Sequence, residues 1–264
     1  MRLCIIAGGG ELPQEILKRA TLEKKFTSVI CIKGEATPKN FLEANNSIEI
    51  SIGKIGKATK FLEENNISHI VFAGSVQRPS LASISVDLEG AKLLALLLKE
   101  KFLGDDNLLK ITIQYFEKKG FTILAPSDFL KATKKGALTN SKPNKQALED
   151  INVAKSAFKK IGTLDVGQSL IVSEKRIIAI EGAEGTDNMI CRSKNYINNH
   201  AVLLKLPKPG QETRIDMPTI GPKTIDIMHK SNLSGLVINK NVIVISEKET
   251  IDKANSLGIY IYVI

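Results

Sequence analysis

The sequence predicts an α/β fold, with a doubly wound parallel sheet in the N-terminal half and an α+β domain with a mixed sheet in the C-terminal half. In residues 1–125, short β-rich runs alternate with longer helical patterns, which is typical of a mostly parallel sheet. Beyond residue 143 the pattern changes to paired strand segments interspersed with helices. A chain of 264 residues is long enough for one large or two medium domains.

The elements of the first half follow from their residue types. The strands are short runs rich in β-branched residues, and the first helix begins at Pro13, because proline suits the first helical turn. The expected strands are 2–8, 27–33, 47–52, 69–74 and 121–126, and the further helices are 57–65, 87–102 and 105–120. In such a sheet the βα loops open at the carboxyl edge, where open α/β sheets bind ligands.

The loop after the first strand, AGGGELP, resembles a dinucleotide-binding loop only in part. Gly8-x-Gly10 lets backbone amides approach a pyrophosphate. However, Pro13 stands where the third glycine is expected, Lys33 stands where a ribose-binding acid is expected, and Glu35 falls in the following turn. A plain βα turn that needs small residues therefore remains an equal alternative.

A second loop, AGSVQRPSL, follows the strand at 69–74. Because the carboxyl ends of parallel strands share one edge, it places Gly74 and Arg78 beside Gly9 and Gly10. We expect these residues to contact substrate.

The second half begins after a polar stretch that reads as a linker. The predicted organisation is an N-terminal domain at 1–133, a linker at 134–143 and a C-terminal domain at 144–264. A helix is expected at 147–162, hairpins around 173–175 and 239–241, a strand at 200–206, helices at 186–194 and 222–230, and a final helix and strand within 247–264.

The segment IEGAEGTDNMICR carries acids spaced by three, Glu181, Glu184 and Asp187. Thr186 is placed to cap the next helix, whose free amides could hold a phosphate near Arg192. The alternative is structural, because an acid such as Asp187 in a first helical turn simply complements the helix dipole.

A proline-rich segment, LKLPKPGQETRIDMPTIGP, must be ordered without regular structure, and such segments are often functional. If ETRIDM is extended, Glu212, Arg214 and Asp216 share one side while Ile215 and Met217 face the core. A surface salt bridge is the competing interpretation. Carboxylates with Lys and Arg, without a nucleophile constellation, favour metal-assisted phosphoryl chemistry over acyl transfer.

The net charge of +9 does not indicate nucleic-acid binding. The lysines are spread over helix faces, there is no Trp, and no nucleic-acid motif is present. The positive field favours anionic substrates or an anionic membrane surface. The longest apolar run, AKLLALLL, is too short to span a bilayer and is more typical of a core than of an acyl groove. Without signal-peptide features at the N-terminus, a cytoplasmic location is expected.

Taken together, these motifs resemble the UDP-2,3-diacylglucosamine pyrophosphatase family of lipid A biosynthesis, the type with a Rossmann-like N-terminal domain and a distinctive C-terminal domain. The matching stretches occur in order along nearly the whole chain, and EGTDNMICR and KPGQETRIDMPTIGP are the most specific. The others are IIAGGGELP, FAGSVQRPSL, GDDNLL, LDVGQSLIV and LGIYIYV.

The resemblance implies Mg²⁺-dependent hydrolysis of UDP-2,3-diacylglucosamine to UMP and 2,3-diacylglucosamine 1-phosphate. The family's essential aspartate matches Asp216, with Asp187 as a competitor for the catalytic role. Glu212 departs from the family pattern, in which an Asp is expected after the Gln of KPGQ, and this puts its role in doubt.

The implied roles are as follows. Asp216 is a metal ligand or water-orienting base, and Glu184 and Asp187 support metal or sugar. Substrate contacts come from Gly9, Gly10, Gly74, Arg78, Thr186, Arg192, Lys205 and Arg214. The expected partners are a lipid-linked UDP-sugar and the anionic inner-membrane surface, and a homodimer is left open. The competing functions are an NAD-dependent oxidoreductase and a non-catalytic lipid- or nucleotide-binding protein.

Overall fold

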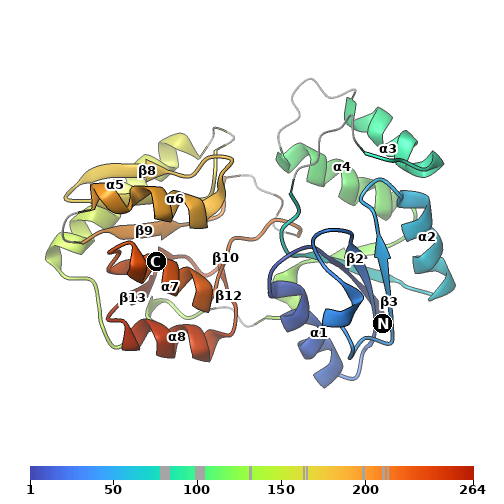
Figure 1. Cartoon of the computed structure of the whole chain (residues 1–264), viewed down its shortest axis with the longest axis horizontal. Coiled ribbons are helices and arrows are strands. Elements are labelled where there is room, and N and C mark those ends of the chain that lie inside the picture. The colour runs from blue at the N-terminus through green and yellow to red at the C-terminus, as the bar shows by residue number, and fades with distance from the viewer. Residues whose placement is uncertain are drawn as a thin grey trace. The chain divides into compact units, whose positions relative to one another are not determined.

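The computed structural model describes residues 1–77, 84–98, 105–130, 133–162, 164, 166–197, 200–209, 212 and 214–264 (Figure 1). The chain divides into two compact units. The first unit is Met1–Lys131 with Glu212–Asp216, and the second is Ala132–Gln211 with Met217–Ile264.

The first unit is built on a five-stranded parallel sheet in the order β3-β2-β1-β4-β5. The strands are β1 (Arg2–Ala7), β2 (Phe26–Ile32), β3 (Asn46–Ile50), β4 (His69–Ala73) and β5 (Thr122–Leu124). This is the order of a doubly wound sheet, and the direction of winding reverses between β1 and β4. The predicted parallel sheet is therefore confirmed.

Helices cover both faces of this sheet. Alternate residues of a strand point to opposite faces. Cys4 packs in one core cluster with Leu62 of α2 (Ile55–Glu64) and Phe116 of α4 (Asp105–Lys118). Leu3 and Ile5 are fully buried on the other side, where α1 (Leu12–Leu22) contacts β1 and β2. Short 3-10 helices η1 (Pro38–Asn40) and η3 (Pro126–Asp128) complete the described elements.

Helix α3 (Leu88–Leu98) corrects one prediction. The run AKLLALLL is more typical of a core, but in α3 only Gly90 and Leu93 are buried. Leu88, Leu96 and Leu98 are 75%, 46% and 59% exposed. The expectation was wrong because apolar composition alone does not say whether a second element covers the helix.

The second unit contains a six-stranded mixed sheet in the order β6-β13-β11-β9-β7-β8. Strands β9, β11 and β13 are parallel, while β6, β7 and β8 add antiparallel pairings at its two sides. The strands are β6 (Gly136–Ala137), β7 (Ser169–Ser173), β8 (Arg176–Ile180), β9 (Val202–Lys205), β11 (Gly235–Ile238) and β13 (Tyr260–Val263). The predicted mixed sheet is confirmed.

Two core clusters lie on the two faces of this sheet. On one face, α5 (Lys145–Ile161) packs through Ala154 and Phe158. On the other face, α6 (Gly185–Ser193), α7 (Pro222–Lys230) and α8 (Glu247–Ser256) pack through residues such as Met189, Ile225 and Ala254 (Figure 1). The short helix η4 (Lys194–Tyr196) follows α6.

The first expected hairpin is present and the second is not. Glu174 and Lys175 have φ of 51° and 63°, the left-handed pair that a tight β7–β8 turn requires. In contrast, β11 lies between β9 and β13, so both its edges are already paired. The chain turns away at Asn239, and β12 (Ile243–Val244) pairs with β10 (Thr219–Ile220) in a separate sheet.

Residues 134–143, expected as a linker, include β6, which pairs with β13. Among the described residues, no helix combines the length and the apolar character needed to cross a membrane.

Candidate functional site

The carboxyl edge of the five-stranded sheet brings the opening glycines together with the loop after β4. The Gly9 amide donates to the Ser75 carbonyl at 2.7 Å, and the Ser75 amide donates back to the Gly9 carbonyl at 3.0 Å. The Gly8 amide donates to the Ala73 carbonyl at 2.8 Å. The loops after β1 and β4 are thus joined through their backbones, with Gly9 and Gly74 side by side as predicted.

Glycine is required at these positions for different physical reasons. A Cβ at Gly8 would lie 2.3 Å from the Ser75 carbonyl oxygen, and a Cβ at Gly74 would lie 2.4 Å from that of Gly9. Both are therefore needed for the close backbone approach. Gly10 has a φ of +89° and open space beside it, so its glycine is required by backbone conformation rather than by packing.

Glu35, which the sequence places in the turn after the second strand and which was not predicted as a site residue, belongs to this edge. Its Oε1 accepts the backbone amide of Gln77 at 2.8 Å, and its Oε2 would lie 3.4 Å from a Cβ at Gly9. The loops after β1, β2 and β4 therefore meet at Gly9. Arg78, predicted to contact substrate here, lies outside the described residues.

The start of α6 in the second unit holds a buried polar cluster. The ammonium of Lys205 donates to Thr186 Oγ1 at 2.9 Å, and that hydroxyl donates to Glu181 Oε1 at 3.1 Å. Ser169 Oγ lies 3.2 Å from the same hydroxyl. Lys205, Thr186 and Ser169 are all buried. Thr186 and Lys205, both predicted substrate contacts, are thus in direct contact with one another.

Thr186 does not cap the helix, which corrects the expectation. Helix α6 begins at Gly185, its N-cap is Glu184, and no side chain caps it. Thr186 lies inside the first turn because Gly185, at a φ of +79°, begins the helix earlier than expected. Its hydroxyl turns inward to Lys205 instead.

Glu184 and Arg192 form an ion pair at the end of β8. Two guanidinium nitrogens of Arg192 lie 2.7 and 3.0 Å from Glu184 Oε1, and one also donates to the Ile180 carbonyl at 2.9 Å. The hydrogen bonds from Arg192 hold the pKa of Glu184 below its usual value. The ion pair with Arg192 therefore favours the ionised form of the Glu184 carboxyl.

Asp187 faces the first turn of α7. Its Oδ2 lies 2.8 Å from the ammonium of Lys223. The hydrogen bond to Asp187 is the main cause that raises the pKa of Lys223. Asp187 and Glu184, although close in sequence, therefore have different cationic partners.

The segment that carries Asp216 groups with the first unit and is turned rather than extended. The amides of Ile215 and Asp216 donate to the Glu212 carbonyl at 3.2 and 3.0 Å. Ile215 packs against the core cluster that lies over β1. Ile215 therefore faces a core as expected, but it does so from a turn and not from an extended segment.

Arg214 fixes this turn. It donates to both carboxylate oxygens of Glu212 at 2.9 Å and to Glu117 Oε1 of α4 at 2.7 Å. The hydrogen bonds from Arg214 lower the pKa of Glu212, and those to Glu212 and Glu117 raise the pKa of Arg214. Arg214 thus holds the loop that presents Asp216, which is half-buried.

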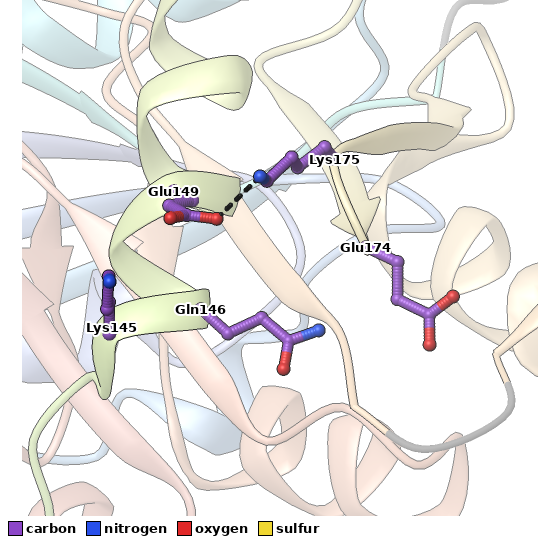
Figure 2. A pocket seen from close by; sticks show the side chains of 5 residues that line it. All are labelled: Lys145, Gln146, Glu149, Glu174 and Lys175. Atoms are coloured by element: carbon purple, nitrogen blue, oxygen red, sulfur yellow. Dashed lines mark ion pairs between the residues drawn. The ribbon is translucent and has the colours of Figure 1, made fainter.

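A pocket of about 520 Å³ lies elsewhere in the second unit, between the start of α5 and the β7–β8 turn (Figure 2). Across it, the Lys175 ammonium pairs with Glu149 Oε2 at 2.7 Å. The pocket is lined by Lys145, Gln146, Glu149, Glu174 and Lys175. None of these is a predicted site residue.

Comparison with known proteins identifies the family. The model of the LpxI N-terminal domain matches residues 2–133, and that of the LpxI C-terminal domain matches residues 134–262. The chain belongs to the LpxI family. The predicted family resemblance is thereby confirmed.

A curated relative agrees with this LpxI assignment over the full length. It is the UDP-2,3-diacylglucosamine pyrophosphatase LpxI of Caulobacter vibrioides, which is 33% identical over 271 residues, covering 98% of this chain and 96% of the relative.

Two solved structures have a lower sequence identity to this chain. An L-threonine dehydrogenase from Phytophthora infestans has 12% identity and a TM-score of 0.29, covering 61% of this chain and 49% of that one. A biotin carboxylase complex from Campylobacter jejuni has 12% identity and a TM-score of 0.25, covering 74% and 41%. Neither likeness is close enough to bear on fold or function.

Proposed function

We propose that this LpxI-family protein hydrolyses the pyrophosphate bond of UDP-2,3-diacylglucosamine, giving UMP and 2,3-diacylglucosamine 1-phosphate for lipid A synthesis. The observation that carries the proposal is the relative of that activity, which is 33% identical over 98% of this chain. Matches to both LpxI domain models support it, because they cover the two halves of the chain that bear the glycine loop and the carboxylates.

The proposed chemistry assigns the reacting centre to Asp216. Its carboxylate stands on a turn fixed by Glu212 and Arg214, and such rigidity is what a group that orients water requires. In this proposal Asp187 assists catalysis, while Lys205 and Arg192 offset phosphate charge. Lys205 is suited to that role because its buried ammonium is held in place by Thr186.

Mg²⁺ belongs to the proposal as well. Within the described residues there is no group of three or more His, Cys, Asp or Glu side chains that could hold a metal. Mg²⁺ is commonly bound through one or two carboxylates together with substrate phosphates and water. Asp216 and Glu184 are the two carboxylates predicted as ligands, and each could supply one bond to such an ion, which would neutralise phosphate oxygens and lower the pKa of a bound water.

Helix α3 supports the proposed peripheral contact with the inner membrane. A substrate with two acyl chains resides in a bilayer, so the enzyme must reach the interface. Leu88, Leu96 and Leu98 are 75%, 46% and 59% exposed on α3, and apolar side chains presented on a helix favour such contact. We propose that α3 inserts these leucines among the lipid headgroups.

The test of the proposed function is Asp216→Ala. We expect UMP release to fall at least about a hundredfold, because a positioned acid or base typically contributes that much or more. The variant should still bind the substrate when this is measured in the absence of vesicles. Its circular dichroism spectrum should match that of the wild type. The matched control is Asp252→Ala, which removes an exposed aspartate of α8. Wild-type turnover by Asp216→Ala would remove Asp216 from the mechanism.

A further inference from the structure

Three loops meet at the carboxyl edge of the five-stranded sheet, next to the point where its winding reverses. They follow β1, β2 and β4, and β1 lies between the other two strands. Open α/β sheets bind ligands in the crevice at such a reversal. Glu35, from the loop after β2, extends across this edge to the amide of Gln77, from the loop after β4.

The turn after β2 brings Glu35 to this position. Gly34 adopts a φ of +89°, and the Glu35 amide donates to the Ile32 carbonyl at 3.0 Å, which closes the turn. In dinucleotide-binding folds, the acid that follows the second strand hydrogen-bonds ribose. Lys33 occupies the expected place in the sequence, but the turn folds the chain back and places Glu35 at the edge instead.

The surroundings of Gly9 define what this corner offers to a ligand. A Cβ there would lie 3.2 Å from Ser75 Oγ and 3.4 Å from Glu35 Oε2, so a hydroxyl and a carboxylate oxygen stand over a bare Cα. Beside them, no atom of the described residues lies within 4 Å of the Cβ position of Gly10, which leaves room for a bound group.

The charge at this corner selects the ligand chemistry. In the part of the chain that the structure describes, the Glu35 carboxylate forms no ion pair and only its Oε1 has a hydrogen-bond partner. A carboxylate accepts several hydrogen bonds, and its negative charge disfavours a phosphate at the same place. The fitting ligand group is therefore a neutral one that donates from adjacent hydroxyls, such as a ribose diol.

We infer that Glu35 is the ribose-binding residue for the uridine nucleotide, accepting hydrogen bonds from the ribose hydroxyls through Oε2, with Ser75 Oγ as a second contact. This assignment rests on the proposed function for the identity of the base. The ribose contact makes the site selective for a ribonucleotide over a deoxyribonucleotide.

The test is calorimetric titration of the full chain with UMP and with 2′-deoxy-UMP. A hydrogen bond to a charged group is worth enough for the wild type to prefer UMP by roughly tenfold to a hundredfold. In Glu35→Gln the preference should fall to near unity, because an amide oxygen can still accept from Gln77 while the acceptor for ribose is lost. Glu43→Gln, at an exposed position of the same unit, should keep the wild-type preference.

Turnover supplies a second readout. With UDP-2,3-diacylglucosamine, Glu35→Gln should raise KM by a similar factor and leave kcat little changed. The reason is that the ribose contact is made equally in the ground state and in the transition state. Equal affinities of the wild type for the two nucleotides, or no measurable affinity for UMP, would overturn the inference. The inference would also be overturned if Glu35→Gln lost affinity for UMP and for 2′-deoxy-UMP equally, because the carboxylate would then act only by holding the loop. Failure of the wild type to release UMP from substrate would instead refute the proposed function.

Discussion

Thr186 and Lys205 show how a residue predicted for binding is held in place by its neighbours. The Thr186 hydroxyl lies among a buried ammonium, a carboxylate and a second hydroxyl, so it links groups from β7, β9 and the start of α6. Buried polar groups of this kind stabilise a structure only when each keeps its partner. The cluster is therefore both a support for the proposed phosphate contact and a part of the fold.

The variant Thr186→Val tests this linking role. It preserves shape but removes the three hydrogen bonds that the buried Thr186 hydroxyl makes with the Lys205 ammonium, the Ser169 hydroxyl and the Glu181 carboxylate. We expect the free energy of unfolding to fall by about 1–3 kcal/mol, measured by urea denaturation. Thr122→Val, at an exposed threonine of β5, is the control and should change it by less than about 0.5 kcal/mol. A similarly small effect of Thr186→Val would show that the cluster contributes little to stability.

Arg214 illustrates a different outcome at the same scale. The residue types ETRID predict an ion pair or a phosphate contact, and the structure shows the ion pairs, to Glu212 and to Glu117. Glu212 accepts from Arg214 through both of its carboxylate oxygens. Glu212 thus has a structural function in orienting the turn of Asp216.

Helix α3 is the element whose surface differs most from expectation. Its apolar residues are largely exposed, and the described part of the first unit covers only Gly90 and Leu93. Such a helix face is typical of interfacial contact rather than of a core.

The variant Leu96→Gln tests the membrane contact. Glutamine is a good helix former, and Leu96 is 46% exposed, so stability should stay within about 0.5 kcal/mol of the wild type. Cosedimentation with anionic phospholipid vesicles should decrease severalfold. Leu42→Gln, at an 87% exposed leucine outside α3, should bind vesicles like the wild type. Unchanged cosedimentation of Leu96→Gln would contradict the assignment of α3 to the interface.

Most elements could be predicted from sequence because their signals are local. The runs RLCIIA and FTSVICI became β1 and β2, and Pro13 lies in the first turn of α1. The prediction of the second hairpin was wrong because β11 pairs with β9 and β13, which are distant in sequence. The residues of a local turn carry no information about that pairing.

The candidate site was predictable only in part, for a similar reason. The contact of Gly9 with the loop after β4 follows from parallel topology and was expected. The place of Glu35 depends on a left-handed Gly34 and on a strand order that joins loops far apart in sequence. The inward turn of Thr186 depends on Lys205, which comes from another strand.

At the scale of the whole molecule, the predicted functional residues belong to both units. The first unit holds the glycine loop, Glu35 and the turn of Asp216, while the second holds Glu184, Asp187 and the Thr186–Lys205 pair. The LpxI domain models cover both units. We therefore expect the proposed activity to require the intact chain.

The most direct test of the account is incubation of the intact protein with UDP-2,3-diacylglucosamine and Mg²⁺, with both products quantified by mass spectrometry. We predict equal amounts of UMP and 2,3-diacylglucosamine 1-phosphate, loss of both products with EDTA, and recovery when Mg²⁺ is restored. No UMP across a range of divalent metals would contradict the account. A rise in melting temperature with NAD but not with the UDP-sugar lipid would then favour an oxidoreductase.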